Sequence, residues 1–78
     1  ELGEIESVIN SHPKVKNSAC IFKENIICFY ESKEELDLRN FAKEKLVSYM
    51  IPSKFTRLDS FKLNQNGKID RKVLNELA

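Results

Sequence analysis

The spacing of apolar residues predicts a helix at the start of the chain and a strand soon after it. The helix should end at His12-Pro13, because a proline disfavours helical geometry in the residue before it. From residue 15 to residue 22 apolar and polar side chains alternate, which predicts a strand with one face toward the core. The helical apolar positions are Leu2, Ile5, Val8 and Ile9, and the strand places Val15, Ala19 and Ile21 on one face and Lys16, Ser18 and Cys20 on the other.

A denser apolar run at residues 26–30 predicts a second strand that is buried on both faces. Such a strand should lie centrally in the sheet, with the first strand antiparallel to it across a turn at residues 23–25. A three-residue loop would place Cys20 directly opposite Cys28, whereas a two-residue loop would put them out of register. Each cysteine is expected to be a small buried side chain.

The second half of the chain predicts a further helix, a third strand and a last helix. Ser32-Lys33-Glu34-Glu35 has the spacing of a capping box, which should start the second helix. Residues 55–60 alternate as a strand does, and the apolar segment Tyr49-Met50-Ile51 should be core. These elements predict an α+β fold, with a small three-stranded sheet packed against about three helices. The helical positions are Leu38, Phe41, Ala42 and Leu46 in the second helix and Val73, Leu74 and Leu77 in the last.

The link between the third strand and the last helix holds the chain's candidate site. Asn66-Gly67 is a strong turn signal, because both residues tolerate the positive φ that most residues avoid. Asp70 is a good N-cap for the last helix, and Ile69 should anchor the link in the core. Lys68 should therefore project from a locally stiffened backbone, and a cation held in this way suits an anionic substrate.

Composition narrows the class of protein. A chain of 78 residues is enough for one small domain. Its 13 basic and 12 acidic residues are interspersed, which argues against nucleic acid as the main partner, and no apolar run approaches the ~20 residues of a membrane span. His12 lacks a partnered Ser or Cys motif and there is no CxxC, so neither a catalytic triad nor a metal site is predicted. Gly67-Lys68 also lacks the flanking residues of a P-loop.

Three strings of the sequence, in order, resemble the adenylate-forming enzymes. They are Glu1-Leu2-Gly3-Glu4-Ile5-Glu6, Leu46-Val47-Ser48-Tyr49-Met50-Ile51-Pro52 and Asn66-Gly67-Lys68-Ile69-Asp70-Arg71. The resemblance is to the amino-acid-activating domains of nonribosomal peptide synthetases and to D-alanine carrier-protein ligases, since acyl-CoA relatives usually carry Ser at Asn66. That family commonly has Pro at Val47 and Pro-Leu-Thr where this chain has Lys62-Leu63-Asn64, so the approach to the turn is expected to be less rigid.

The resemblance implies that residues 1–78 are one C-terminal lid subdomain, excised from a larger adenylation enzyme. Lys68 matches the lysine that contacts the substrate carboxylate and the ATP phosphate, and Asn66, Gly67 and Asp70 would support its loop. ATP and Mg²⁺ would be used by the complete enzyme and bound by no part of this fragment alone. The implied partners are the N-terminal adenylation core domain, the amino-acid substrate and a phosphopantetheinyl carrier protein, to which the lid would move for thioester transfer.

The resemblance also implies a cytoplasmic enzyme, in which Cys20 and Cys28 should be reduced thiols. The amino acid itself would be selected in the core domain. The alternative from a different class is a stand-alone α+β protein-interaction module without catalysis. The reading frame upstream of Glu1 would separate the two, because the enzyme requires a core domain there and the module does not.

Overall fold

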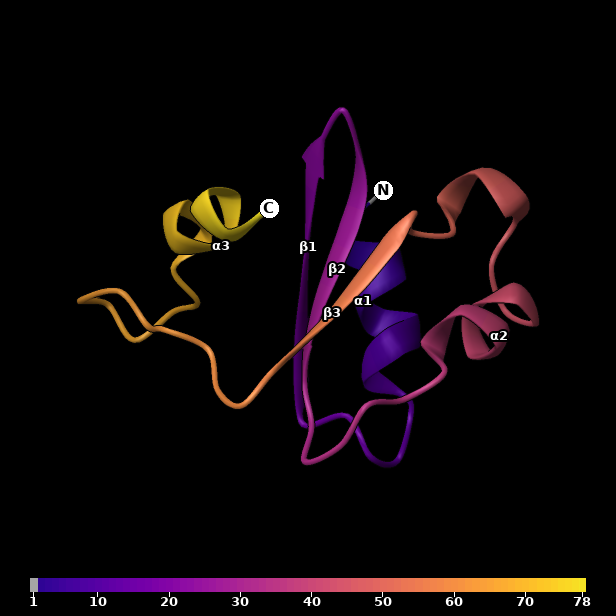
Figure 1. Cartoon of the computed structure of the whole chain (residues 1–78), viewed down its shortest axis with the longest axis horizontal. Coiled ribbons are helices and arrows are strands. Elements are labelled where there is room, and N and C mark those ends of the chain that lie inside the picture. The colour runs from indigo at the N-terminus through magenta and orange to yellow at the C-terminus, as the bar shows by residue number, and fades with distance from the viewer. Residues whose placement is uncertain (1) are drawn as a thin grey trace.

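The computed structural model describes residues 2–78 and confirms the predicted α+β class, a three-stranded sheet with helices on both faces (Figure 1). The strands lie in the order β1-β2-β3, with β1 antiparallel and β3 parallel to the central β2. None of the described helices is long and apolar enough to cross a membrane. The elements are α1 Leu2–Asn10, β1 Asn17–Lys23, β2 Asn25–Glu31, α2 Leu38–Lys43, the short 3₁₀ helix η1 Ser48–Met50, β3 Lys54–Leu58 and α3 Arg71–Leu77.

The hairpin between β1 and β2 settles the register that the sequence left open. Lys23 pairs with Asn25, and Glu24 between them has a positive φ of 65°. Cys20 consequently lies directly opposite Cys28, as a three-residue loop requires. β2 is the central strand and is buried on both faces, as predicted.

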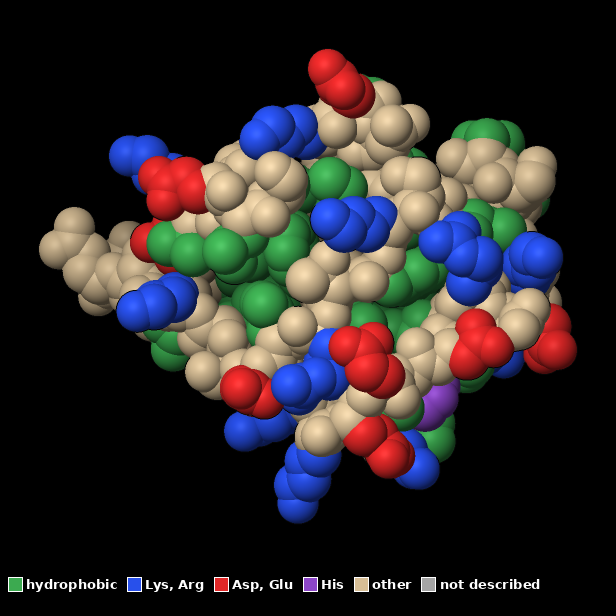
Figure 2. Space-filling model, in the orientation of Figure 1, with side chains coloured by type: hydrophobic (Ala, Val, Ile, Leu, Met, Phe, Trp, Pro, Cys, Tyr) green, Lys and Arg blue, Asp and Glu red, His purple; other side chains and the backbone are tan. Residues whose placement is uncertain are grey.

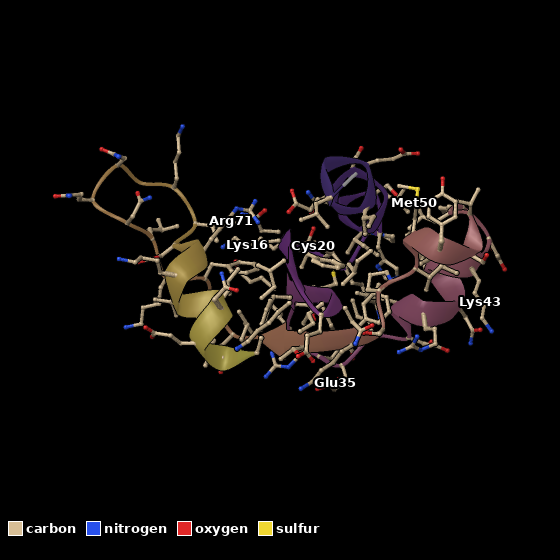
Figure 3. All side chains as sticks on the ribbon, turned by 90° about the horizontal axis from the view of Figure 1, so that it is seen from above. Lys16, Cys20, Glu35, Lys43, Met50 and Arg71 are labelled. Carbon is tan, nitrogen blue, oxygen red and sulfur yellow. The ribbon has the colours of Figure 1, made fainter. Side chains whose placement is uncertain are left out.

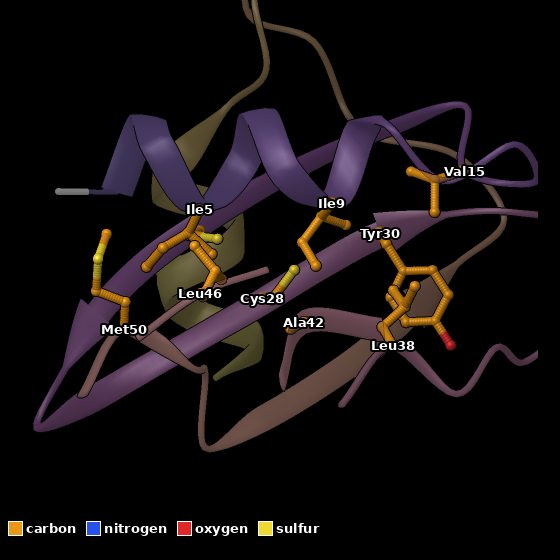
Figure 4. Close-up of a cluster of buried hydrophobic side chains, with 10 residues drawn as sticks. Ile5, Ile9, Val15, Cys28, Tyr30, Leu38, Ala42, Leu46 and Met50 are labelled. Atoms are coloured by element: carbon orange, nitrogen blue, oxygen red, sulfur yellow. The ribbon is translucent and has the colours of Figure 1, made fainter. Parts of the chain in front are cut away.

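Two hydrophobic clusters lie on opposite faces of the sheet. The larger one is covered by α1 and α2 (Figure 4), and the smaller one is covered by α3 through Leu74. Because β1 has a helix on each face, Ser18 and Cys20 are buried as well as Ala19 and Ile21, and the burial expected of Cys20 is confirmed. The larger cluster contains Ile5, Ile9, Val15, Cys20, Cys28, Tyr30, Leu38, Ala42, Leu46 and Met50, and the smaller one Ala19, Ile21, Ile27, Phe29, Phe61 and Leu74.

Val15 also departs from the predicted strand pattern. It lies in the cluster of Cys20, although its spacing from Ala19 predicted a shared face. The reason is that β1 begins only at Asn17, and the Val15 amide instead donates to the carbonyl oxygen of His12 at 3.1 Å. The alternation of a strand therefore does not extend back to Val15.

The second helix begins five residues later than the capping-box pattern predicts. Its N-cap is Asp37, which accepts a hydrogen bond from the Asn40 amide at 3.3 Å. The Ser32 hydroxyl instead donates to the carbonyl oxygen of Glu34 within an irregular segment. That segment is held by the Tyr30 hydroxyl, which accepts a hydrogen bond from the Leu36 amide at 3.1 Å. The Tyr30 hydroxyl thus holds the segment that the capping box was expected to start as a helix, and Asp37 caps the helix instead.

The segment around η1 is only partly core. Met50 is buried and Ile51 is half-buried, but Tyr49 is 82% exposed, so its predicted burial is wrong. In a single 3₁₀ turn with three residues per turn, consecutive side chains point in different directions. Met50 takes the inward position, and Tyr49 is turned to the solvent.

Candidate functional site

The lysine-bearing loop, Lys62–Asp70, leaves the sheet as a narrow ribbon of two short extended arms, which projects at the left of Figure 1. Leu63 and Ile69 form an isolated antiparallel bridge. The Asp70 amide donates to the Lys62 carbonyl oxygen at 2.8 Å, and the Asn64 amide donates to the Lys68 carbonyl oxygen at 2.7 Å. The two arms are therefore tied to each other on both sides of the bridge.

Asn64 fixes the tip of this loop, and sequence reasoning missed it. Its Oδ1 accepts hydrogen bonds from the amides of Asn66 at 2.8 Å and Lys68 at 3.1 Å, and its carbonyl oxygen accepts one from Gly67 at 2.9 Å. Three hydrogen bonds thus tie the tip together at this departure from the family pattern, and the lower rigidity expected there stays a prediction. The available signal was the preference of Asn for the first position of turns, where its side chain bonds to following amides.

The other predicted loop residues take the positions expected of them. Gly67 has a φ of +80°, and no heavy atom lies within 4 Å of where a Cβ would be, so the glycine is required by the backbone angle. Asp70 caps α3, accepting hydrogen bonds from the amides of Lys72 at 3.1 Å and Val73 at 3.4 Å. Ile69 is half-buried against the smaller cluster.

Lys68 is exposed and forms no side-chain hydrogen bond or ion pair with any residue in the described range 2–78. It lines a hollow of about 750 Å³ in which Arg71 and Lys72 are the other cationic side chains and Asp70 is the acidic one. An ammonium group without a protein partner, mounted on a fixed backbone, can donate three hydrogen bonds to an anionic ligand. The remaining lining residues are Asn17, Leu63, Asn64, Gly67 and Ile69.

A second feature that the sequence did not reveal links this region to α1. Arg71 donates from Nη1 to the Cys20 carbonyl oxygen at 2.9 Å and from Nη2 to Glu6 Oε2 at 3.2 Å. Glu6 Oε2 also accepts the Cys20 amide hydrogen at 2.8 Å. We call Glu6, Cys20 and Arg71 the edge clasp. Figure 3 shows Arg71 and Cys20 on their neighbouring elements, α3 and β1.

No other part of the described chain offers competing chemistry. Cys20 and Cys28 are free and buried, and the hydrogen bond of the Cys28 thiol to Cys20 together with burial raises the pKa of that thiol, which keeps it neutral. Among residues 2–78, no three His, Cys, Asp or Glu side chains are grouped so that they could hold a metal ion. Acidic and basic side chains alternate over the face shown in Figure 2.

The fold and this loop define a small α+β subdomain that presents one lysine on a fixed ribbon. Residues 4–68 match the family model for the AMP-binding enzyme C-terminal domain, and the chain belongs to that family. Gramicidin S synthase 2 of Brevibacillus brevis is 46% identical over 97% of this chain, which spans 2% of that protein. Tyrocidine synthase 1 of Brevibacillus parabrevis is 41% identical, and the chain spans 8% of it.

Solved structures give the same family. NpsA of Klebsiella oxytoca, in complex with 3-hydroxyanthranilyl-AMSN, superposes with a TM-score of 0.88 at 28% identity, covering 99% of this chain and 17% of that one. A four-domain nonribosomal peptide synthetase bound to AMP and glycine has a TM-score of 0.82 at 29% identity. The match covers 91% of this chain and 6% of that one. This chain is therefore similar to a small part of much longer enzymes.

Proposed function

We propose that this chain is the lid subdomain of an amino-acid-activating adenylation enzyme and that it supplies Lys68 to aminoacyl-adenylate formation. The observation that carries the proposal is the exposed Lys68 without a protein partner, mounted on a ribbon that Asn64 and Gly67 fix. The peptide synthetases among the relatives support an amino acid as the substrate. The structure bound to AMP and glycine supports adenylate chemistry.

The chemistry requires a mobile cation. A substrate carboxylate oxygen attacks the α-phosphorus of ATP, the bond to the β-phosphate oxygen breaks, and pyrophosphate leaves. Negative charge is then spread over the phosphoryl and carboxylate oxygens, and a positioned ammonium group stabilises it. In this proposal Lys68 donates to both the carboxylate and the phosphate, and its flexible stem allows it to reach both.

The rest of the site would lie in a core domain. The hollow beside Lys68 is lined by one edge of the lid, so the ATP and the amino acid would be enclosed only when this edge closes on that domain. Mg²⁺ would take its ligands from the phosphates and the core domain. After adenylate formation, rotation of the lid would withdraw Lys68 and allow a carrier-protein thiol to accept the acyl group in a cytoplasmic enzyme.

The experiment compares two neighbouring lysines in the parent enzyme. Lys68→Ala should reduce amino-acid-dependent ATP–pyrophosphate exchange by about a hundredfold to a thousandfold, which is the typical effect of removing one preorganised donor. Lys72→Ala removes a cation from the same hollow but leaves the backbone cap of α3 intact, so exchange should stay within a few-fold of normal. Near-normal exchange in Lys68→Ala would contradict the proposed role.

A further inference from the structure

The edge clasp joins helices that lie on opposite faces of the sheet. β1 is an edge strand, with α1 over the larger cluster and α3 over the smaller one. The amide and carbonyl groups of Cys20 point away from β2, because they bond to Glu6 and Arg71. The clasp thus passes around the free edge of β1 and connects residues 65 positions apart in the sequence.

The clasp is placed where it can set the orientation of the lysine-bearing loop. Arg71 is the first residue of α3, directly after the N-cap Asp70 and three residues after Lys68. The base of the ribbon is otherwise seated on the smaller cluster through Phe61 and Ile69. Apolar contacts are not directional, so they restrain the position of the ribbon more than its orientation. The planar guanidinium group of Arg71 donates two hydrogen bonds in fixed directions, which restrains the orientation as well.

The contacts of the edge clasp are better suited to orienting the lysine-bearing loop than to stabilising the fold. The Arg71 side chain is 51% exposed and that of Glu6 is 20% exposed. Ion pairs this accessible to solvent contribute little to folding free energy. A small misplacement of a catalytic group can nevertheless lower a rate by orders of magnitude.

We infer that Glu6 and Arg71 are positioning residues that hold the Lys68 loop at a fixed orientation to α1 during adenylate formation. This inference rests on the proposed function and adds two residues that act on the reaction through Lys68. Because the clasp binds α3 to α1, the ribbon turns together with the rest of the lid, and Lys68 arrives at the same place in each closure.

The test uses steady-state exchange kinetics of the parent enzyme. Arg71→Gln and Glu6→Gln should each lower kcat about tenfold with less than about a twofold change in KM, since the substrates would be held by the core domain. Glu6→Gln should disturb the fold less than Arg71→Gln, because its amide oxygen can still accept the Cys20 amide hydrogen. The double variant should also have a kcat about tenfold below normal and no lower, since both changes break the same network.

Arg57→Gln is the matched control. Arg57 likewise bonds a backbone carbonyl, that of Ser32 at 2.6 Å, and pairs with a carboxylate, that of Asp59 at 2.9 Å, but neither partner belongs to α1 or α3. It should change the melting temperature by as much as Arg71→Gln does and leave kcat normal. Unchanged kcat in the clasp variants, or a hundredfold loss in the double variant, would overturn the inference.

The outcome for the clasp can be separated from that for the proposed function by Lys68→Ala in the same assay. If Lys68→Ala abolishes exchange while the clasp variants are normal, the clasp is only structural and the proposed role of Lys68 stands. If Lys68→Ala exchanges normally, the proposed function fails whatever the clasp variants do.

Discussion

The two glycines of the chain, Gly3 in α1 and Gly67 in the lysine-bearing loop, can be compared because both have open space where a Cβ would be. At both Gly3 and Gly67 an added Cβ would meet no heavy atom within 4 Å, but only Gly67 has a positive φ, of +80°. Gly67→Ala should destabilise the protein by about 1 to 2 kcal/mol, the cost of a side chain in the left-handed region. Gly3→Ala in α1 should stabilise it by about 0.5 to 1 kcal/mol.

Urea denaturation of both variants checks this prediction, with the wild-type chain as the reference. Equal shifts of the midpoint in the same direction would show that the angle at Gly67 does not constrain the loop. The need for glycine could be predicted from the Asn66-Gly67 pair, because turn preference is local. The bond from Asn64 to the Asn66 amide could have been predicted from the turn preference of Asn, but the bond to the Lys68 amide could not, because it forms only when the loop closes.

Among the elements, the segment that leads into α2 is held by one hydroxyl group from the sheet. Tyr30 is buried, accepts the Leu36 amide hydrogen and donates to Glu35 Oε1 at 3.3 Å. Tyr30→Phe should lower the free energy of unfolding by about 1 to 2 kcal/mol, since the Leu36 amide loses its hydrogen-bond partner. Tyr49→Phe is the control, because Tyr49 is 82% exposed, and it should leave the free energy of unfolding unchanged.

The same hydroxyl group predicts a dependence on alkaline pH. Burial raises the pKa of Tyr30 above its unfolded value of about 10, so the folded state favours the neutral form. This contribution to stability is complete below pH 10 and is lost as the pH rises through the folded pKa. Urea titrations should therefore show that the free energy of unfolding of the wild type falls toward that of Tyr30→Phe above pH 10. A difference between the two that stays constant with pH would contradict the raised pKa of Tyr30.

The elements could be predicted from apolar spacing, but their ends could not always be. The last helix begins after Asp70 as expected, because its cap is local. The capping-box prediction at Ser32 failed because Tyr30 offers the following segment a tertiary partner. Burial of β1 on both faces was missed as well, since Ser18 reads as polar although its hydroxyl bonds to Asn10 of α1 at 2.8 Å.

At the scale of the whole molecule, the sequence predicted the class of fold and the loop that holds the candidate site. Asn66, Gly67, Lys68 and Asp70 are adjacent in the chain, so one turn and one cap were enough to place them. The edge clasp could not be predicted, because Glu6 and Arg71 meet only when α1 and α3 take opposite faces of β1. The distribution of helices over the two faces is a property of the complete sheet.

The central claim is that Lys68 acts in adenylate formation and not in acyl transfer. The most direct measurement is the ratio of the two half-reactions in the Lys68→Ala parent enzyme. Pyrophosphate exchange should fall by about a hundredfold or more, while transfer from a supplied aminoacyl adenylate to the carrier thiol should stay within a few-fold of wild type. Equal losses in both half-reactions at an unchanged melting temperature would contradict the claim, and so would near-normal exchange.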